Sequence, residues 1–253
     1  MGSLLIYMVK SACCLAFFYL FYKLLLGKET FHRFNRFALL GVLVLSGILP
    51  FVQIARHASE AAGSVQAQVG QLTMQSVVVA DNTFPWQWLF IIVYLLGLLF
   101  FALKLLISYG QLLHTVHRST SISVEGEPNV RLILLDKSVS PFSWMRYVVM
   151  TKSDYQENGR AILTHEIAHI HRFHSIDMLL CDIFILFQWF NPAAWLVKKE
   201  LQNIHEFEAD DEVLSKGIDP KSYQLLLIKK AVGKGSTLWP TALITVHLKN
   251  VSL

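Results

Sequence analysis

The sequence predicts a mainly α membrane protein, with three N-terminal transmembrane helices followed by a small α/β unit. Its 253 residues are 54% hydrophobic and 16% charged, whereas about 25% of the residues of typical soluble domains are charged. The apolar residues form three long blocks near the N-terminus, and short β-branched runs follow in a more polar stretch. This composition excludes a disordered, collagen-like or coiled-coil chain and argues against an ordinary soluble enzyme.

Three apolar blocks, at about residues 4–26, 37–55 and 86–107, are each long enough to cross a bilayer as a helix. A helix needs roughly 20 residues to span a hydrocarbon core of about 30 Å. Buried helices of a soluble protein are the alternative, which three such blocks so close together disfavour. We therefore assign residues 1–113 to transmembrane helices and residues 114–253 to a second domain.

The loops between the blocks predict the orientation of the chain. The first connection carries Lys28, Arg33 and Arg36 against Glu29, whereas the second has Arg56 as its only fixed cation. By the positive-inside rule, the first loop is cytoplasmic and the second is external. We expect a multi-pass protein of the cell (inner) membrane, with the N-terminus outside and the second domain on the cytoplasmic side. The net charge of +4 forms no concentrated basic patch of the kind that binds nucleic acid.

The polar middle part of the chain carries the pattern of a small α/β unit. Residues 129–136 and 147–152 are short, apolar and rich in β-branched side chains, which is typical of strands. Pro141 indicates a loop between them, at 138–145. Residues 153–156 (Ser-Asp-Tyr-Gln) fit a capping box at the start of a helix.

The helix that follows contains an H-E-x-x-H motif, in which the two histidines are His165 and His169. Residues i and i+4 share a helix face, so both imidazoles can bind one metal ion. Glu166 can then take a proton from a water molecule at that metal, as in metalloproteases. Chance matches to so short a string occur, and a surface helix with ordinary charges is the alternative. The apolar neighbours of the motif would partly bury these side chains, which favours a ligand role.

A catalytic zinc site needs a third protein ligand and an open position. A second predicted helix, from about Pro192 to Leu214, offers Glu206 and Asp210 on one face. Glu206 can bind Zn²⁺ while Asp210 accepts the other ring N–H of a ligand histidine. Glu208 is rotated by about 200° from Glu206 and should point elsewhere. A solvated acidic helix is the alternative, but the upstream H-E-x-x-H favours the metal site.

Residues 176–197, between the two ligand helices, are apolar enough to resemble a fourth span. A single crossing would place the two halves of the zinc site on opposite sides of the membrane, so the segment must cross twice, dip in and return, or stay outside. Asn191 and Pro192 offer a helix break. Because Asp177 and Asp182 would be costly in lipid, we expect a membrane-associated helical hairpin in which Asp182 faces other helices.

Histidines outside the H-E-x-x-H motif receive structural interpretations. His171 and His174 follow the ligand helix, and we expect both at the membrane interface. His205 adjoins the expected third ligand and could donate a hydrogen bond to an oxyanion. A partly exposed structural role is favoured for it.

The strings H-E-I-A-H, N-P-A-A-W and H-E-F-E-A-D together resemble the BlaR/MecR family of membrane-embedded zinc peptidases, which are gluzincins. The resemblance extends to K-E-T-F-H-R-F-N-R after the first block and to S-P-F-S-W before the metal helix, and so covers nearly the whole chain. It implies a gluzincin unit that binds Zn²⁺ through His165, His169 and Glu206. It also implies Glu166 as the general base and Asp210 as the supporting aspartate.

The resemblance further implies a role in transmembrane signal transduction. Members of the family respond to an external stimulus by activating a cytoplasmic peptidase that inactivates a repressor. We therefore expect an endopeptidase that cleaves a cytoplasmic repressor, a partner protein or itself. No S-x-x-K acylation motif occurs in residues 1–253, so we expect the protease module without the sensor domain and without β-lactam sensing.

Other classes of function remain as alternatives. A non-catalytic, metal-stabilised signalling scaffold is disfavoured because a structural zinc needs no base such as Glu166. A transporter would need polar residues along several spans, and Lys10 and Asp182 are too few. The expected partners are the lipid bilayer and a protein substrate laid along an edge strand such as residues 147–152, with no nucleic acid and with a homodimer left open.

Overall fold

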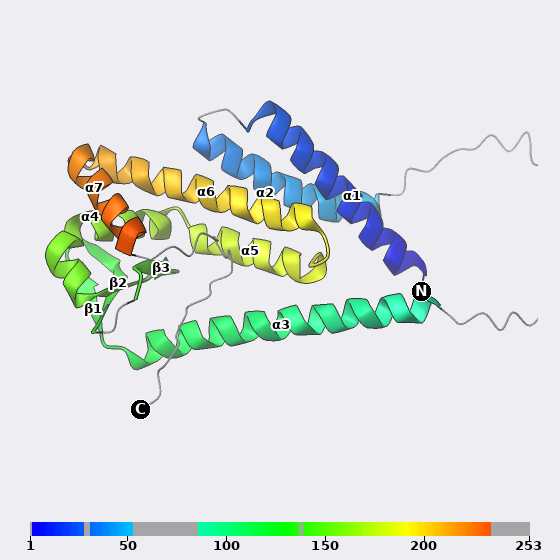
Figure 1. Cartoon of the computed structure of the whole chain (residues 1–253), viewed down its shortest axis with the longest axis horizontal. Coiled ribbons are helices and arrows are strands. Elements are labelled where there is room, and N and C mark those ends of the chain that lie inside the picture. Colours follow the sequence, from blue (N-terminus) through cyan, green and yellow to red (C-terminus); the bar gives the residue numbers. More distant parts are fainter. Residues whose placement is uncertain (1, 28–30, 53–85, 137–138, 234–253) are drawn as a thin grey trace, which may run out of the picture.

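The N-terminal part of the chain consists of long apolar helices in this computed structural model, which describes residues 2–27, 31–52, 86–136 and 139–233 (Figure 1). These helices are α1 (Gly2–Leu25), α2 (His32–Ile48) with a short 3₁₀ turn η1 (Leu49–Phe51), and α3 (Trp86–Arg118). By length and composition, all three are able to cross a membrane. Their outward faces carry large exposed apolar side chains such as Phe17, Phe37 and Phe100, as expected of helices in contact with lipid.

Two of these helices extend beyond their predicted blocks. Helix α2 begins at His32 rather than at 37, so Arg36 is a helix residue and not a loop residue. Helix α3 continues past 107 to Arg118, because the chain becomes amphipathic there instead of breaking. Its last turns bury Val116 against Ile133 and Val149 of the sheet that follows. The boundary predicted at 113/114 therefore falls inside a helix that joins the two parts of the protein.

The sheet has four strands in the order β1-β2-β4-β3. These are β1 (Ser121–Val124), β2 (Glu127–Leu135), β3 (Phe142–Trp144) and β4 (Tyr147–Thr151). Strands β2 and β4 are parallel and confirm the two predicted strands, whereas β1 and β3 pair antiparallel at the two edges. Because β4 lies inside the sheet, the expectation that residues 147–152 form an edge strand is wrong. The edge strand next to β4 is β3, which lies in the predicted loop at 138–145.

Helix α4 (Lys152–His171) follows β4 directly. Its N-cap is Thr151, whose hydroxyl oxygen accepts a hydrogen bond from the Asp154 backbone N–H at 3.0 Å. The same hydroxyl donates to the Asp154 carboxylate at 2.8 Å. The capping box predicted at 153–156 is therefore wrong, because the capping residue is the last residue of the preceding strand.

Three further helices complete the described chain. They are α5 (His174–Phe187), α6 (Pro192–Ser215) and α7 (Pro220–Gly233). Helices α5 and α6 lie side by side, joined by a tight turn (Figure 1). At that turn the Asn191 side chain accepts a hydrogen bond from the Ala193 backbone N–H at 3.0 Å, and Pro192 opens the new helix. The helix break thus lies where the Asn-Pro pair indicates it.

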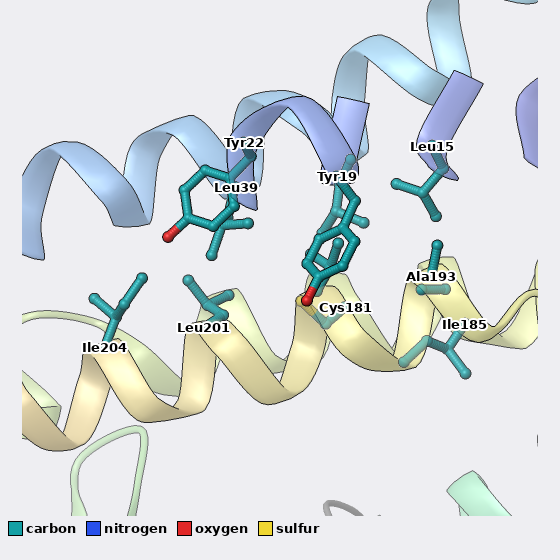
Figure 2. Packing of buried hydrophobic residues seen from close by; sticks show 12 residues of the cluster. Leu15, Tyr19, Tyr22, Leu39, Cys181, Ile185, Ala193, Leu201 and Ile204 are labelled. Carbon is teal, nitrogen blue, oxygen red and sulfur yellow. The ribbon is translucent and has the colours of Figure 1, made fainter. Parts of the chain in front are cut away.

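Helix α6 contributes side chains to two hydrophobic cores. On one side it packs against α1 and α2, as Leu201 and Ile204 do against Tyr22 and Leu39 (Figure 2). On the other side Val213 joins a core made of strands β2 and β4 and helices α4 and α7. The helix that carries the acidic motif therefore packs against both the sheet and the candidate spans α1 and α2.

A buried ion pair joins α5 to α6. Lys198 of α6, whose side chain is 2% exposed, bonds the carboxylate of Asp182 on α5. Tyr109 of α3 donates its hydroxyl hydrogen to the other oxygen of Asp182 at 3.1 Å. The prediction that Asp182 faces other helices is confirmed, although no local pattern in the sequence indicates its partners Lys198 and Tyr109.

Candidate metal centre

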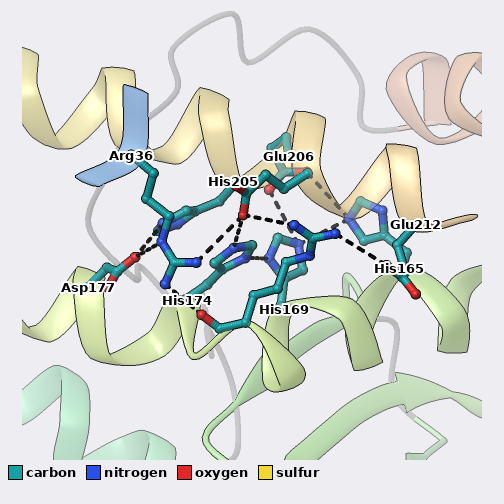
Figure 3. A network of polar contacts seen from close by, with 10 residues as sticks. Arg36, His165, His169, His174, Asp177, His205, Glu206 and Glu212 are labelled. Carbon is teal, nitrogen blue, oxygen red and sulfur yellow. Dashed lines mark hydrogen bonds and ion pairs between the residues drawn. The ribbon is translucent and has the colours of Figure 1, made fainter. Parts of the chain in front are cut away.

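The histidines of the H-E-x-x-H motif meet the acidic motif where α4 packs against α6 (Figure 3). His165, His169 and Glu206 offer ligand atoms that all lie within 4.8 Å of one another. The Nε2 atoms of the two histidines are 3.2 Å apart. The Glu206 carboxylate oxygens lie 3.5 Å from His165 Nε2 and 3.8 Å from His169 Nε2. The spacing of the two histidines along α4 and the packing of α6 against α4 therefore bring the three predicted ligands together.

The donor set fits a catalytic zinc ion. Two imidazole nitrogens and one carboxylate are a ligand set that Zn²⁺ takes in enzymes, with a fourth position left open. Here the histidine side chains are 14% and 15% exposed, whereas Glu206 is 63% exposed. The two histidine side chains are thus largely buried, whereas Glu206 lies on the side of the site that is open to solvent.

Asp210 supports the first histidine from the position that the sequence predicts. Its carboxylate oxygen lies 3.1 Å from His165 Nδ1 and accepts the hydroxyl hydrogen of Tyr223 at 2.6 Å. The same hydroxyl is 2.9 Å from His165 Nδ1. Tyr223 was not predictable from the sequence, because it comes from a separate helix, α7, and belongs to no motif.

The charges of this group are set by burial and hydrogen bonding. Burial lowers the pKa of His165, but hydrogen bonds to Asp210 and Glu206 and nearby carboxylates outweigh it and raise the pKa to about 9. Burial raises the pKa of Asp210, and its bonds to His165 and Tyr223 more than reverse this, so the carboxyl stays ionised. Burial and the adjacent Asp210 raise the pKa of Tyr223, so its hydroxyl remains a donor. Asp210 therefore holds the Nδ1–H of His165, and a metal ion at Nε2 would have to replace the proton that this raised pKa favours there.

The second histidine is supported through another histidine. His169 Nδ1 lies 2.7 Å from Nδ1 of His174, whose Nε2 lies 3.1 Å from a carboxylate oxygen of Glu208. Burial lowers the pKa of His169 to about 3, with help from the charge of His165, and that of His174 to about 4. Both rings are thus neutral, so His169 Nδ1–H donates to His174, and His174 Nε2–H donates to Glu208. This tautomer leaves His169 Nε2 free for a metal.

The expected positions of His174, at the membrane interface, and of His205, partly exposed, are wrong. His174 is 3% exposed and lies inside the metal centre rather than at an interface, whereas His171 is exposed and pairs with Glu127. His205 is also buried, bonded to Asp177 at 2.9 Å and stacked on the His174 ring at 3.9 Å between ring centres. The cause is Phe173, whose left-handed backbone (φ 57°) breaks the chain between α4 and α5 and sets the direction in which α5 starts.

Glu166 lines a cleft of about 880 Å³ together with the three predicted ligands. Glu166 is 6% exposed and directly follows His165 in α4. Strand β3 forms another wall, with Phe142 and Trp144 facing the same space. The cleft therefore brings together the three candidate metal ligands, the Glu166 carboxylate and a strand at the edge of the sheet.

The Tyr223→Phe variant is expected to bind zinc about tenfold more weakly than the wild type. Removal of the hydroxyl takes one hydrogen bond from Asp210, and loss of such a supporting contact typically costs 10–100-fold in metal affinity or activity. The measurement is competition with a fluorescent zinc chelator in detergent. Tyr155→Phe, an exposed tyrosine on α4, is the control. An affinity within twofold of the wild type would show that the hydroxyl does not support the site.

Comparison with known proteins agrees with this geometry. A family model described as BlaR1 peptidase M56 matches residues 48–251, which include both motifs. The regulatory protein BlaR1 of Staphylococcus aureus is 20% identical over 252 residues, an alignment that covers 85% of this chain and 43% of that protein. The chain thus spans less than half the length of this relative. Because the family model covers most of the sequence, the chain belongs to the BlaR1 peptidase M56 family of metallopeptidases.

Proposed function

We propose that this protein is a membrane-embedded, zinc-dependent endopeptidase that acts in transmembrane signal transduction. The observation that carries the proposal is the convergence of His165, His169 and Glu206 beside Glu166 in one cleft. When bound there, Zn²⁺ supplies a Lewis acid that lowers the pKa of water and polarises a peptide carbonyl. The name of the matched relative, a regulatory protein, supports the signalling role.

Each residue of the site has one task in this proposal. His165, His169 and Glu206 hold the ion, and Asp210 keeps His165 in the tautomer that presents Nε2. Glu166 accepts the proton of the attacking water on a carboxylate oxygen and passes it to the nitrogen of the leaving amine.

The substrate in this proposal is an extended protein segment that pairs with β3. The free edge of Phe142–Trp144 borders the cleft, so an added strand would run past the metal ligands. Strand β4, which the sequence analysis favoured, has both edges occupied by β2 and β3. A repressor-like protein, a partner or a segment of this protein itself fits this mode of binding.

The proposed orientation places the metal centre on the cytoplasmic side of the cell membrane. Arg36, near the start of α2, contacts Asp177 beside the metal centre. The start of α2, which carries Arg33 and Arg36, and the cleft therefore lie at the same end of the helices, and the positive-inside rule assigns this end to the cytoplasm. In this frame, α5 and the first half of α6 enter the membrane beside α1 and α2 and return.

Metal analysis of the purified protein tests the proposal. We expect about one zinc ion per wild-type chain and a clear loss of zinc in His165→Ala and Glu206→Ala, because each removes one of three ligands. Asp211→Ala, an exposed carboxylate on the same helix as Glu206, is the matched control and should keep its zinc. Full zinc retention in Glu206→Ala would refute the assignment of the third ligand.

A further inference from the structure

Arg36 of the membrane-spanning helix α2 is turned into the protein and reaches the support of the metal centre (Figure 3). Its Nε donates to a carboxylate oxygen of Asp177 at 2.6 Å. One terminal nitrogen donates to the backbone carbonyl of Arg172 at 2.6 Å, and the other lies 3.6 Å from Glu208. One guanidinium therefore contacts α5, the end of α4 and α6 at once.

Of the two carboxylates that Arg36 contacts, Glu208 bonds His174 directly, and Asp177 reaches it through His205. Glu208 accepts the hydrogen bond of His174 Nε2, and Asp177 accepts that of His205, whose ring is stacked on His174 with an angle of 9° between the planes. His174 in turn lies 2.7 Å from His169 Nδ1. A continuous path of direct contacts thus leads from Arg36 to a metal ligand.

The carboxylates need this cation because they are buried. The side chains of Asp177 and Glu208 are 7% and 2% exposed. Ionised groups removed from water require a charged or hydrogen-bonding partner. Arg172 also lies 3.4 Å from Glu208, but its second contact is with Glu212, away from Asp177. Arg36 is the cation that joins Asp177 and Glu208.

Arg36 also fixes the corner between the two helices that carry the histidine pair. Arg172 ends α4, and Phe173 makes the left-handed turn into α5. The hydrogen bond from Arg36 to the Arg172 carbonyl satisfies a backbone acceptor at the helix end, which lacks an intrahelical partner. The position of this corner sets how the His174 ring meets the His169 ring.

We propose that Arg36 is a positioning residue for the metal ligand His169, acting through Asp177, Glu208 and His174. The setting of α2 then controls how tightly the site holds its metal. The inference rests on the proposed function, in which His165, His169 and Glu206 bind zinc.

Zinc affinity of an Arg36→Gln variant tests this inference. We expect about tenfold weaker binding in competition with a zinc chelator, because loss of outer contacts to a ligand typically costs 10–100-fold. The absorption spectrum of the Co²⁺-loaded protein should change as well, since the His169 ring is no longer held in one orientation. Arg33→Gln, an exposed arginine on the same helix, is the matched control and should bind zinc like the wild type.

A double-mutant cycle with His174→Phe separates positioning from general loosening of the fold. If Arg36 acts through His174, the double variant should bind zinc no more weakly than the weaker single variant. A double variant whose fold loss of zinc affinity equals the product of the two single losses would overturn the proposal. A folded Arg36 variant with zinc affinity within twofold of the wild type would overturn it as well. Should Arg36→Gln not fold, Arg36→Lys keeps the charge, lacks the forked geometry and is judged by the same limits.

The two proposals fail in different ways. If the wild type binds no zinc, or if His165→Ala binds it equally well, the metal centre itself is refuted. If His165→Ala loses zinc while a folded Arg36 variant binds as the wild type does, the metal centre stands and the positioning role is refuted.

Discussion

Replacing Glu166 by glutamine is expected to lower peptidase activity by about 10²–10⁴-fold while the zinc content stays unchanged. Glutamine has nearly the same shape as glutamate, so the closely packed surroundings of this buried residue are preserved. It has no carboxylate to accept the proton of the attacking water. The measurement is the hydrolysis of a quenched-fluorescence peptide mixture, and of the protein itself, by zinc-loaded protein in detergent.

Glu125→Gln is the control for this experiment. Glu125 is an exposed carboxylate in the turn between β1 and β2, away from the cleft residues, so its loss should leave activity unchanged. Wild-type activity of a zinc-loaded Glu166→Gln variant would refute the enzymatic role of Glu166. It would favour the non-catalytic signalling scaffold, in which the metal only stabilises the packing of α4 against α6.

Replacing Lys198 by methionine is expected to destabilise the protein by about 3–5 kcal/mol. The substitution keeps most of the side-chain volume but leaves the carboxylate of Asp182 buried, with the Tyr109 hydroxyl in place of a cation. Removal of one partner of a buried ion pair costs far more than loss of a surface pair, because the remaining charge cannot return to water. The measurement is thermal or denaturant unfolding of the protein in detergent micelles.

Two further variants test whether the buried ion pair causes this loss of stability. Lys199→Met removes an exposed cation from the next position of the same helix and should change the free energy of unfolding by no more than about 0.5 kcal/mol. Asp182→Asn combined with Lys198→Met removes both charges and should recover most of the lost stability. A single Lys198→Met variant as stable as Lys199→Met would show that the pair contributes nothing.

The predicted parts of the site share one property, which is that local helix geometry determines them. His165 and His169 share a face because they are four residues apart, and so do Glu206 and Asp210. The structure brings these two faces together within 4.8 Å at the ligand atoms. The three apolar helices were predictable for a similar reason, because a span needs an uninterrupted apolar stretch and nothing from the rest of the chain.

The missed features depend on contacts between distant parts of the chain. Arg36 and Asp177 are 141 positions apart, and no local pattern marks either as a partner of the other. His174 has the sequence context of an interfacial residue, and only the sharp turn at Phe173 carries it into the site. Strand β3 has three residues next to a proline, too few to show an alternating pattern, and pairing with β4 alone defines it.

The pairing of Lys198 with Asp182 has a consequence for the biogenesis of the protein. Each residue would carry a full charge into lipid if its helix entered the membrane alone, and neither helix offers the other a partner until the two lie side by side. In the proposed orientation, we therefore expect α5 and α6 to associate before or during insertion, so that neither helix is an independent transmembrane span. In that orientation, we expect the α5–α6 hairpin to integrate as one unit once translation has passed Lys198.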